Sequence, residues 1–342
     1  SLLMGNPCDI DPATVTWRRC LDVNDRTLRQ VITGLGGSKN GVPRETGFDI
    51  TSASEVMAIL GLSRDAADLR KRLGSIIVAS NRAGDPVTAE DLGAAGAMAV
   101  VLKDAIHPTF MQTLEGTGCF VHTGPFANIA HGNSSIVADR IALKLCDYVV
   151  TESGFGADMG AEKFFNIKCR VSGLKPDAAV VVATIRALKV HSGRFKVVPG
   201  KPLPEEMLKE DVSAIEEGIG NLRRHIENVG KFGVPVVVAL NRFPTDSDAE
   251  VSAVIELAKQ CGAFDAVVSD VHARGGEGGA ALAEAVVRAC EEVPANFSTL
   301  YPDEMPIKEK IQTVCTEIYR ADGVDFKPAA RKAMRKYEKL GL

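Results

Sequence analysis

Short, continuously apolar runs recur along the chain and predict the strands of a sheet that is covered on both faces. From Gly74 onward these runs alternate with stretches of helical periodicity. A strand buried on both faces reads as an unbroken apolar run, as in parallel sheets flanked by helices. The runs that we expect to form strands are residues 75–80, 97–103, 119–123, 147–152, 179–185, 234–241 and 266–270.

Helical segments are expected between these runs. In residues 211–230 the apolar positions follow steps of three and four, which places them on one stripe of a helix. That stripe consists of Val212, Ile215, Ile219, Leu222, Ile226 and Val229. Ser52 and Glu55 have capping-box spacing and predict a helix over Glu55–Leu60. The triplet Asp246-Ser247-Asp248 caps another helix through about Gln260, and further helices are expected at 278–292 and 307–321.

The alternation of strands and helices predicts the fold class. We expect an α/β protein with a doubly wound, mostly parallel sheet, followed by a second, smaller α/β domain. Residues 192–206 are rich in Gly, Pro and Lys and predict a surface loop or a boundary. The expected domains are therefore 1–191 and 192–342. The basic segment 327–339 is expected to be the solvated face of an amphipathic C-terminal helix.

Composition and charge exclude several classes of function. Among the 342 residues, 40 Lys and Arg face 44 Asp and Glu, a net charge of −4 that argues against general nucleic-acid binding. The sequence contains no run of 18 uncharged apolar residues, so no membrane span is predicted, and no secretory signal is visible. The eight cysteines show neither CxxC nor zinc-ligand spacing, so we expect reduced, buried thiols in a cytosol-like compartment.

The carboxyl ends of the expected strands carry the candidate ligand-binding residues, because ligands of open α/β sheets collect there. Residues 154–160 follow the run 147–152 and fit the pattern GxGxxG only loosely. Their glycines would let the backbone approach an anion, although a plain strand-to-helix turn explains them equally well. Residues 124–133 follow the run 119–123 and offer small side chains for a planar base. His131 in that segment could be a catalyst, but a hydrogen-bonded structural histidine is the simpler interpretation.

Phe243 is the most informative aromatic residue, since only 5% of the chain is aromatic. It follows the expected strand 234–241, and an aromatic side chain exposed at a strand end needs something to cover it. A flat heterocyclic ligand would do so, and His272, which follows the next expected strand, could close a sandwich. The alternative is that Phe243 packs beneath the following helix.

No catalytic residue is assigned by motif. The phosphate-binding pattern GxxxxGK[ST] is absent, and the glycines of Gly34-Leu-Gly36-Gly37-Ser38-Lys39 have the wrong spacing, so a glycine turn is the better interpretation. The acidic residues Glu45, Glu152 and Asp158 could act in acid–base chemistry, but surface ions or helix caps explain them as well.

Several long strings, taken in order, resemble the formate–tetrahydrofolate ligase (10-formyltetrahydrofolate synthetase) family over nearly the whole chain. They include Gly41-Val-Pro-Arg-Glu-Thr-Gly-Phe-Asp49, Gly124-Pro-Phe-Ala-Asn-Ile-Ala-His-Gly132, Glu152-Ser-Gly-Phe-Gly-Ala-Asp158 and Gly275-Gly-Glu-Gly-Gly279. This family joins formate to tetrahydrofolate with ATP, through formyl phosphate. The resemblance therefore implies a ligase of one-carbon metabolism, linked to purine biosynthesis.

The sequence departs from the family pattern in ways that affect the expected activity. The family's P-loop and formyl-phosphate arginine belong upstream of residue 10, and its small C-terminal domain belongs after residue 341; none of them is found here. The chain thus resembles an internal fragment, inactive by itself. Residues 1–191 would be the C-terminal half of a P-loop-type nucleotide-binding domain. Residues 192–342 would be the middle domain, which contributes the folate pocket.

The resemblance also implies which residues hold the folate. Phe243, with Pro244 beside it, matches one wall of the family's pterin sandwich. The second wall is a Trp in the family and falls on His272, which offers less apolar area. Val268 matches the aliphatic contact, and Phe155 lies in the turn that reaches the folate and formyl region.

Nucleotide contacts, cofactors and partners follow from the same resemblance. Ala127 and Gly160 fall near the family's adenine site. The implied substrates are formate, tetrahydrofolate and ATP with Mg²⁺, a monovalent cation is a further candidate, and no metal ligand is expected in this chain. We expect a cytoplasmic homo-oligomer, mitochondrial if a transit peptide precedes it, without nucleic-acid or membrane partners. A rival hypothesis is a non-catalytic module that supplies an oligomer interface and part of a ligand cleft.

Overall fold

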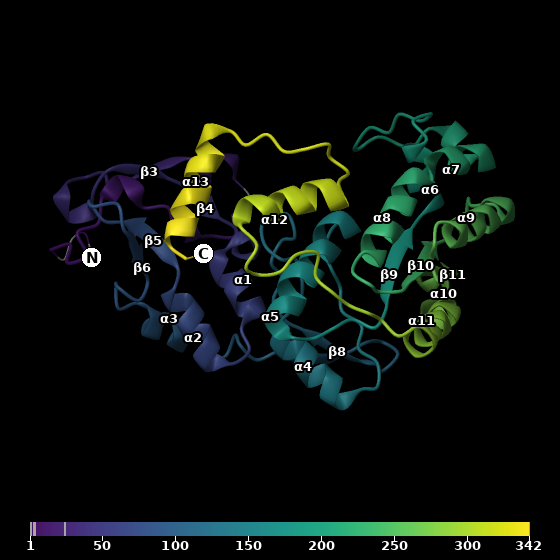
Figure 1. Ribbon diagram of the computed structural model, residues 1–342, viewed down its shortest axis with the longest axis horizontal. Helices are drawn as coiled ribbons and strands as arrows, with labels where there is room; N and C mark the ends of the chain where they lie inside the picture. Colours follow the sequence, from purple (N-terminus) through teal and green to yellow (C-terminus); the bar gives the residue numbers. More distant parts are fainter. Residues whose placement is uncertain (1, 3–4, 24, 342) are drawn as a thin grey trace. The chain divides into compact units, whose positions relative to one another are not determined.

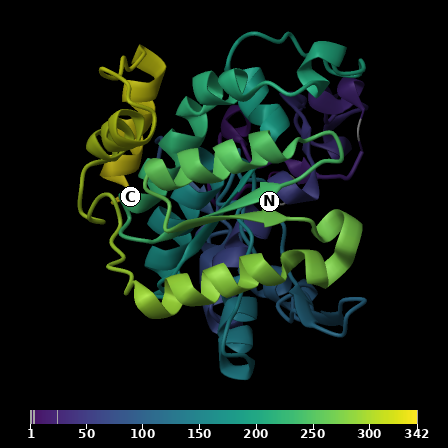
Figure 2. The same ribbon diagram turned by 90° about the vertical axis from the view of Figure 1, so that its right-hand side faces the viewer.

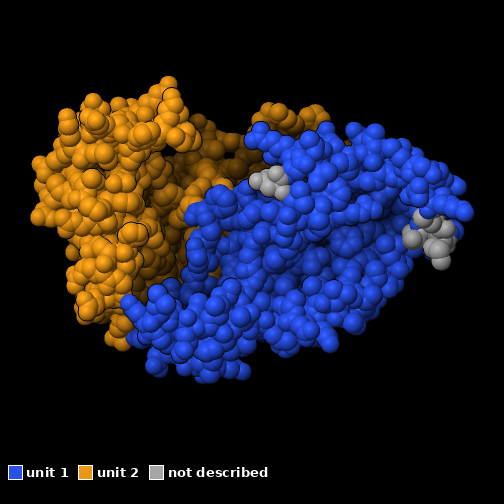
Figure 3. Space-filling model, turned by 180° about the vertical axis from the view of Figure 1, so that it is seen from behind, with its two compact units in different colours: residues 1–155 blue, residues 156–342 orange. Residues whose placement is uncertain are grey.

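The computed structural model describes every residue except 1, 3, 4, 24 and 342 and divides into two compact units (Figure 3). Unit 1 comprises residues 1–155 and unit 2 comprises residues 156–342. The boundary between these compact units falls after Phe155, and the strand Ala179–Ala183 of unit 2 pairs with Val236–Asn241 of the same unit. The functional division at residue 191 stays a prediction.

Unit 2 is built on a parallel sheet of three strands, β9 (Ala179–Ala183), β10 (Val236–Asn241) and β11 (Asp265–Ser269) (Figure 1). The strand order is β11-β10-β9, so β10 lies in the centre. Five of the six residues of β10 are buried, which matches its unbroken apolar sequence. The expected strands 179–185, 234–241 and 266–270 are confirmed, each to within two residues.

Helices cover both faces of this sheet. Val238 packs with the cluster that includes α7 (Val212–Gly218), α8 (Gly220–Gly230) and α9 (Asp248–Gln260). Val237 points to the opposite face and packs against α11 (Ala280–Glu292). Figure 2 shows α9 and α11 on opposite sides of the strands. Unit 2 is therefore a three-layer α/β arrangement.

The apolar stripe expected in residues 211–230 is confirmed. Its members from Ile215 to Val229 are all at most 5% exposed, and Val212 is half-buried. The helix is interrupted at Ile219, between α7 and α8. The expected helices 278–292 and 307–321 are present in two parts each. The remaining helical segments of unit 2 are η5 (Ala157–Ala161), η6 (Phe164–Cys169), α5 (Arg170–Ser172), α6 (Ile185–His191), η7 (Glu205–Leu208), α10 (Val271–Arg274), η8 (Gly275–Gly279), α12 (Ile307–Thr313), η9 (Val314–Ile318) and α13 (Pro328–Lys339).

The segment between α6 and η7 is a surface loop, as its Gly, Pro and Lys content predicts. It forms no helix or strand, and residues 196–202 are exposed. Gly200 adopts φ +78°, a left-handed conformation that glycine reaches without steric strain.

Unit 1 is a mixed α/β arrangement with small sheets, and its core contains Leu69, Leu73, Ile76 and Val78. Its described residues do not form a large doubly wound sheet, so a P-loop-type sheet stays a proposal about a longer protein. Its helices are α1 (Glu55–Leu62), α2 (Ala66–Gly74), α3 (Ala95–Val101) and α4 (Ile136–Leu145), with short 3-10 turns η1 (Pro12–Thr14), η2 (Arg26–Arg29), η3 (Ser38–Asn40) and η4 (Thr51–Ala53). Its paired strands are β1 (Arg19–Cys20) with β4 (Phe48–Asp49), β2 (Val31–Thr33) with β3 (Arg44–Thr46), β5 (Ile77–Ser80) with β6 (Pro86–Thr88), and β7 (Thr109–Gln112) with β8 (Gly118–Val121).

Five expectations for unit 1 were wrong in type, environment or position. Residues 97–103 contribute to helix α3, because the sequence Ala-Gly-Ala-Met-Ala favours a helix over a strand. Residues 147–152 form no strand, and Val150 is 87% exposed. The runs 75–80 and 119–123 do contain strands, but both belong to antiparallel hairpins. The N-cap of α1 is Ser54, whose hydroxyl accepts from the Met57 N–H, and not Ser52.

None of the eight cysteines, all of them described, forms a disulfide, and only Cys169 is buried. Denaturing, non-reducing mass spectrometry after alkylation should therefore count eight modified cysteines. Under native conditions the exposed Cys20, Cys119 and Cys146 should react first, because accessibility limits alkylation of the others. A count below eight in the denatured sample would contradict this prediction.

Candidate functional site

The candidate site of unit 2 lies at the carboxyl edge of its parallel sheet. Asn241, the last residue of β10, is paired with Ser269, the last residue of β11. The Arg242 N–H donates to the Ser269 carbonyl at 3.2 Å, so the two chains leave the sheet side by side. Phe243 lies two residues beyond β10, and His272 lies three residues beyond β11. The structure thus brings the two segments with the predicted pterin walls to one edge.

The turn that carries Phe243 is fixed by its own hydrogen bonds. The Phe243 N–H donates to Oδ2 of Asp246 at 2.8 Å, and the Asp246 N–H donates back to the Phe243 carbonyl at 3.0 Å. Ser247 then begins α9 with a complete capping box, in which its side chain and that of Glu250 each accept a backbone N–H of the other. The backbone of Phe243 is therefore held directly against the start of a helix.

The ring of Phe243 is half-buried and belongs to none of the apolar clusters formed by the described residues. One face is covered by Arg186, whose guanidinium carbon lies 3.8 Å from the ring centroid. Nη2 of Arg186 also donates to Oγ1 of Thr245 at 3.3 Å. Phe243 is thus not simply a core residue beneath the following helix.

Arg186 was missed by sequence reasoning. It stands in the first turn of α6, three residues after the end of β9, so it reaches the same carboxyl edge. The available signal was a positively charged residue close behind a predicted strand, in the position where ligands of parallel sheets collect.

The other predicted folate residues of unit 2 differ in exposure. Val268, on β11, is half-buried and packs in part against the main core, while Pro244 and His272 are exposed. The glycine run after His272 is held close to the strand end, because the Asp270 N–H donates to the Gly278 carbonyl at 3.0 Å. A Cβ on Gly278 would lie 2.3 Å from the Asp270 carbonyl oxygen, so only glycine fits there.

A buried ion pair supports the Phe243 turn from behind. Glu250 is 0% exposed and pairs with the ammonium of Lys189, which is 2% exposed. Glu250 also accepts the N–H groups of Asp211 at 2.8 Å and Ser247 at 3.1 Å. Burial raises the pKa of the Glu250 carboxyl, but the hydrogen bonds from Lys189 and the two N–H groups outweigh it, so its pKa lies below the usual value.

The predicted residues of unit 1 form a second, separate arrangement. Ala127 is 2% exposed and lies between two glycines: a Cβ on Gly132 would lie 2.2 Å from the Ala127 methyl carbon, and one on Gly154 would lie 3.4 Å away. The Gly154 N–H donates to the Gly132 carbonyl at 2.9 Å. The segments 124–133 and 152–155 are therefore brought together within this unit, as close backbone contacts that a larger side chain would disrupt.

Phe155 is exposed and conformationally strained. It is 67% exposed and adopts φ +64°, which non-glycine residues rarely do.

Gly160 is buried in η5 of unit 2. His131 is 2% exposed, and its Nε2 lies 3.3 Å from the Ala58 carbonyl oxygen, which fits the structural interpretation of this residue.

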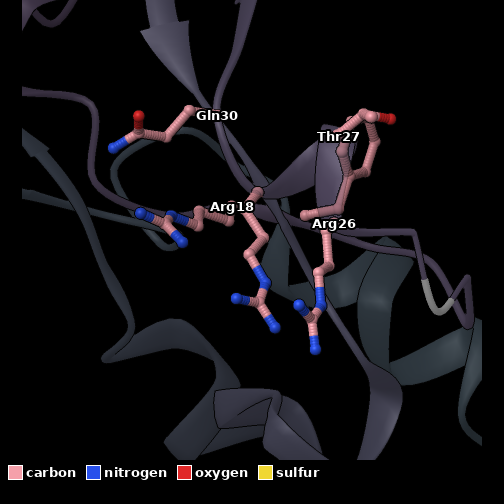
Figure 4. A pocket seen from close by; sticks show the side chains of 6 residues that line it. Arg18, Arg26, Thr27 and Gln30 are labelled. Carbon is pink, nitrogen blue, oxygen red and sulfur yellow. The ribbon is translucent and has the colours of Figure 1, made fainter.

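An open, cationic cavity of about 640 Å³ lies elsewhere in unit 1. Its lining includes Arg18, Arg26 and Arg29, with Thr27 and Gln30 beside them (Figure 4). Arg18 is partly neutralised by Asp49, at 3.6 Å between Nη1 and Oδ1. The three arginines are all exposed, so solvent screens their charge.

Neither a metal-ligand cluster nor a membrane-spanning helix occurs in the part of the chain that the structure describes. Within it, no three His, Cys, Asp or Glu side chains are grouped so that they could hold a metal ion. No helix within it is both long and apolar enough to cross a membrane.

The comparisons with known proteins agree on one family. The model of the family described as formate–tetrahydrofolate ligase matches residues 1–342. The formate–tetrahydrofolate ligase of Desulforamulus reducens is 58% identical over 342 residues, which is 100% of this chain and 60% of that protein. Those of Saccharopolyspora erythraea and Cutibacterium acnes are 57% and 54% identical over 99% of the chain. The chain thus spans 60% of the length of these relatives. With identity this high along its whole length, the chain belongs to the formate–tetrahydrofolate ligase family.

Proposed function

We propose that this chain is part of an ATP-dependent ligase that joins formate to tetrahydrofolate and yields 10-formyltetrahydrofolate. Family membership supports the reaction, and one observation supports the place of the chain in it. That observation is Phe243, an aromatic ring held on a fixed turn at the carboxyl edge of a parallel sheet, outside the core. A flat pterin ring would be bound by stacking on such a side chain.

The proposed chemistry has two balanced steps. A formate oxygen attacks the γ-phosphorus of ATP, ADP leaves, and formyl phosphate forms. The N10 amine of tetrahydrofolate then attacks the formyl carbon, and phosphate leaves as the amine loses its proton. The mixed anhydride is needed because formate itself has no competent leaving group, whereas phosphate is a good one. Mg²⁺ would be carried by the phosphates of ATP, with a monovalent cation as a further candidate.

The proposed site roles follow the family motifs. Phe243, Pro244, Val268 and His272 would line the pterin pocket in unit 2. Phe155 would reach the folate and formyl region, and its exposed, strained conformation supports a role at a ligand. Ala127 and Gly160 would lie near the adenine. Residues 1–191 would then belong to a P-loop-type nucleotide domain, and residues 192–342 to the folate-binding domain of a cytoplasmic homo-oligomer.

Incorporation of radiolabelled formate into tetrahydrofolate tests this proposal in the full-length protein that contains this sequence. The competing function is a non-catalytic module that only supplies an oligomer interface and part of a ligand cleft. ATP- and tetrahydrofolate-dependent incorporation is expected for the ligase. Full-length protein that binds tetrahydrofolate and oligomerises but incorporates no formate would favour the module.

The 342-residue chain by itself should not consume ATP. Its sequence contains no GxxxxGK[ST], so no P-loop lysine and hydroxyl are present to hold the β- and γ-phosphates and their Mg²⁺. A coupled assay for ADP release should show no formate-dependent turnover above background. The full-length ligase, assayed in parallel, serves as the positive control. Formate-dependent turnover by the isolated chain would overturn this prediction.

A further inference from the structure

Arg186 and Phe243 form the closest cation–aromatic contact of unit 2. The guanidinium carbon lies 3.8 Å from the ring centroid of Phe243, whereas the other such contacts among the described residues lie between 5.2 and 6.0 Å. A planar guanidinium at this distance stacks on the ring, and the negative face of the ring attracts its charge. The contact therefore holds the ring in one orientation.

The hydrogen bonding of Arg186 indicates that the ring is its main partner. Nη2 donates to Oγ1 of Thr245 at 3.3 Å, which joins the guanidinium to the same turn. Nε is shielded from solvent and has no hydrogen-bond partner among the described residues. A shielded donor without an acceptor is unfavourable, so the contact with the ring must compensate for it. Arg186 is thus committed to the Phe243 turn and is not a freely solvated surface charge.

The strand order decides on which side of the ring Arg186 stands. β9 and β11 flank β10 on opposite sides. Arg186 follows β9, and Phe243 follows β10. Val268 and His272 belong to β11 and the helix after it. Arg186 therefore covers the ring from the β9 side and leaves the β11 side for a ligand.

We infer that Arg186 is a positioning residue of the folate site: it backs the Phe243 ring and restricts pterin stacking to the ring face toward Val268 and His272. This inference rests on the proposed function. A ring that is already oriented loses less conformational freedom when the ligand binds, and this strengthens binding without a direct contact. The guanidinium does not touch the pterin.

The test compares variants of the full-length ligase with two ligands. Arg186→Met keeps an unbranched apolar stem against the ring and removes the planar cation, while Arg186→Lys keeps the charge but cannot stack as a plane. The matched control is Arg288→Met, which removes an arginine lying 5.9 Å from the Phe264 ring at the amino end of the same sheet. The ligands are tetrahydrofolate and tetrahydropteroate, which lacks the glutamate carboxylates.

Arg186→Met should raise the dissociation constants of both ligands by the same factor, about three- to tenfold. Arg186→Lys should show an intermediate loss, and Arg288→Met should bind as the wild type does. In turnover assays the KM for tetrahydrofolate should rise by that factor at unchanged kcat, since the reacting atoms are not touched. A merely structural role would lower the melting temperature without this selective rise in KM.

Three results would overturn the inference. Unchanged affinity in Arg186→Met would show that the ring needs no backing. Tighter binding would show that the guanidinium occupies the ligand's own face. A loss confined to tetrahydrofolate would show that Arg186 pairs with a glutamate carboxylate. Failure of the proposed function is distinguishable, because the wild type itself would then incorporate no formate, whether or not it binds tetrahydrofolate.

Discussion

Lys189→Met should lower the free energy of unfolding of unit 2 by about 3–5 kcal/mol. The substitution leaves the Glu250 carboxylate, which is 0% exposed, without its cation. The ammonium of Lys189 also donates to the carbonyls of Met207 at 3.1 Å and Lys209 at 2.7 Å, and these acceptors would lose a partner too. Urea denaturation followed by circular dichroism would measure the loss.

Lys259→Met is the matched control for this prediction. The ammonium of Lys259 pairs with Asp265 at 2.9 Å, but its side chain is 51% exposed, and Asp265 keeps a second partner in Arg288. Its loss should change the free energy of unfolding by at most about 1 kcal/mol. Equal losses in the two variants would show that burial does not strengthen the Lys189–Glu250 pair.

The same pair should make stability depend on pH in one direction. Because the folded-state pKa of Glu250 is lowered, its contribution is fully present above the usual carboxyl pKa and is lost as the pH falls through the folded value. The difference between wild type and Lys189→Met should therefore shrink in acid. A difference that grows as the pH falls would contradict the assigned sign.

Phe243→Ala should weaken tetrahydrofolate binding to the full-length ligase by roughly 30- to 150-fold, or about 2–3 kcal/mol. Stacking contributes about 1 kcal/mol beyond burial, and the buried apolar area is lost as well. Phe243 is only half-buried and lies outside the apolar clusters of the described residues. The melting temperature of the Phe243→Ala variant should therefore be only slightly lower than that of the wild type. Calorimetric titration and thermal melts measure the two effects.

His272, the predicted second wall of the pterin sandwich, allows an experiment in which binding is expected to become tighter. His272→Trp restores the family's residue and should tighten tetrahydrofolate binding, because indole offers a larger apolar face than imidazole. His272 is exposed, so the larger side chain meets no packed core. Unchanged affinity in Phe243→Ala would end the pocket assignment, whatever happened to stability. A sharp loss of stability with unchanged affinity would instead make Phe243 a structural residue.

Apolar runs predicted the strands of unit 2 well because we took such a run to mark a strand buried on both faces, and the strands of unit 2 are of this kind. Residues 236–240 are apolar without interruption and are all buried, since a neighbouring strand lies on each side and helices cover each face. Residues 147–152 contain only the short apolar stretch 148–150 between acidic and polar residues; they form no strand in the described structure, and Val150 is exposed. An apolar run predicts a strand only where other segments complete the sheet.

The candidate site was predictable in part for a related reason. Phe243 was found because one aromatic residue at a strand end is locally conspicuous. Arg186 was not, because its role depends on β9 and β10 being neighbours although their sequences lie more than fifty residues apart. Glu250 likewise appears in the sequence as an ordinary helix residue, and only the fold shows that it meets Lys189.

The hydrogen bonds of Lys189 to Met207 and Lys209 have one further consequence, for the surface loop after α6. They join the end of α6 to the residues just beyond the loop. The two ends of the loop are therefore held together by these bonds, whatever the length of the loop. Doubling the length of a closed flexible loop costs only about 0.6 kcal/mol. The exposed stretch around Gly200 is therefore a natural insertion point, where a peptide tag or a reporter can be carried without disturbing the sheet or its carboxyl edge.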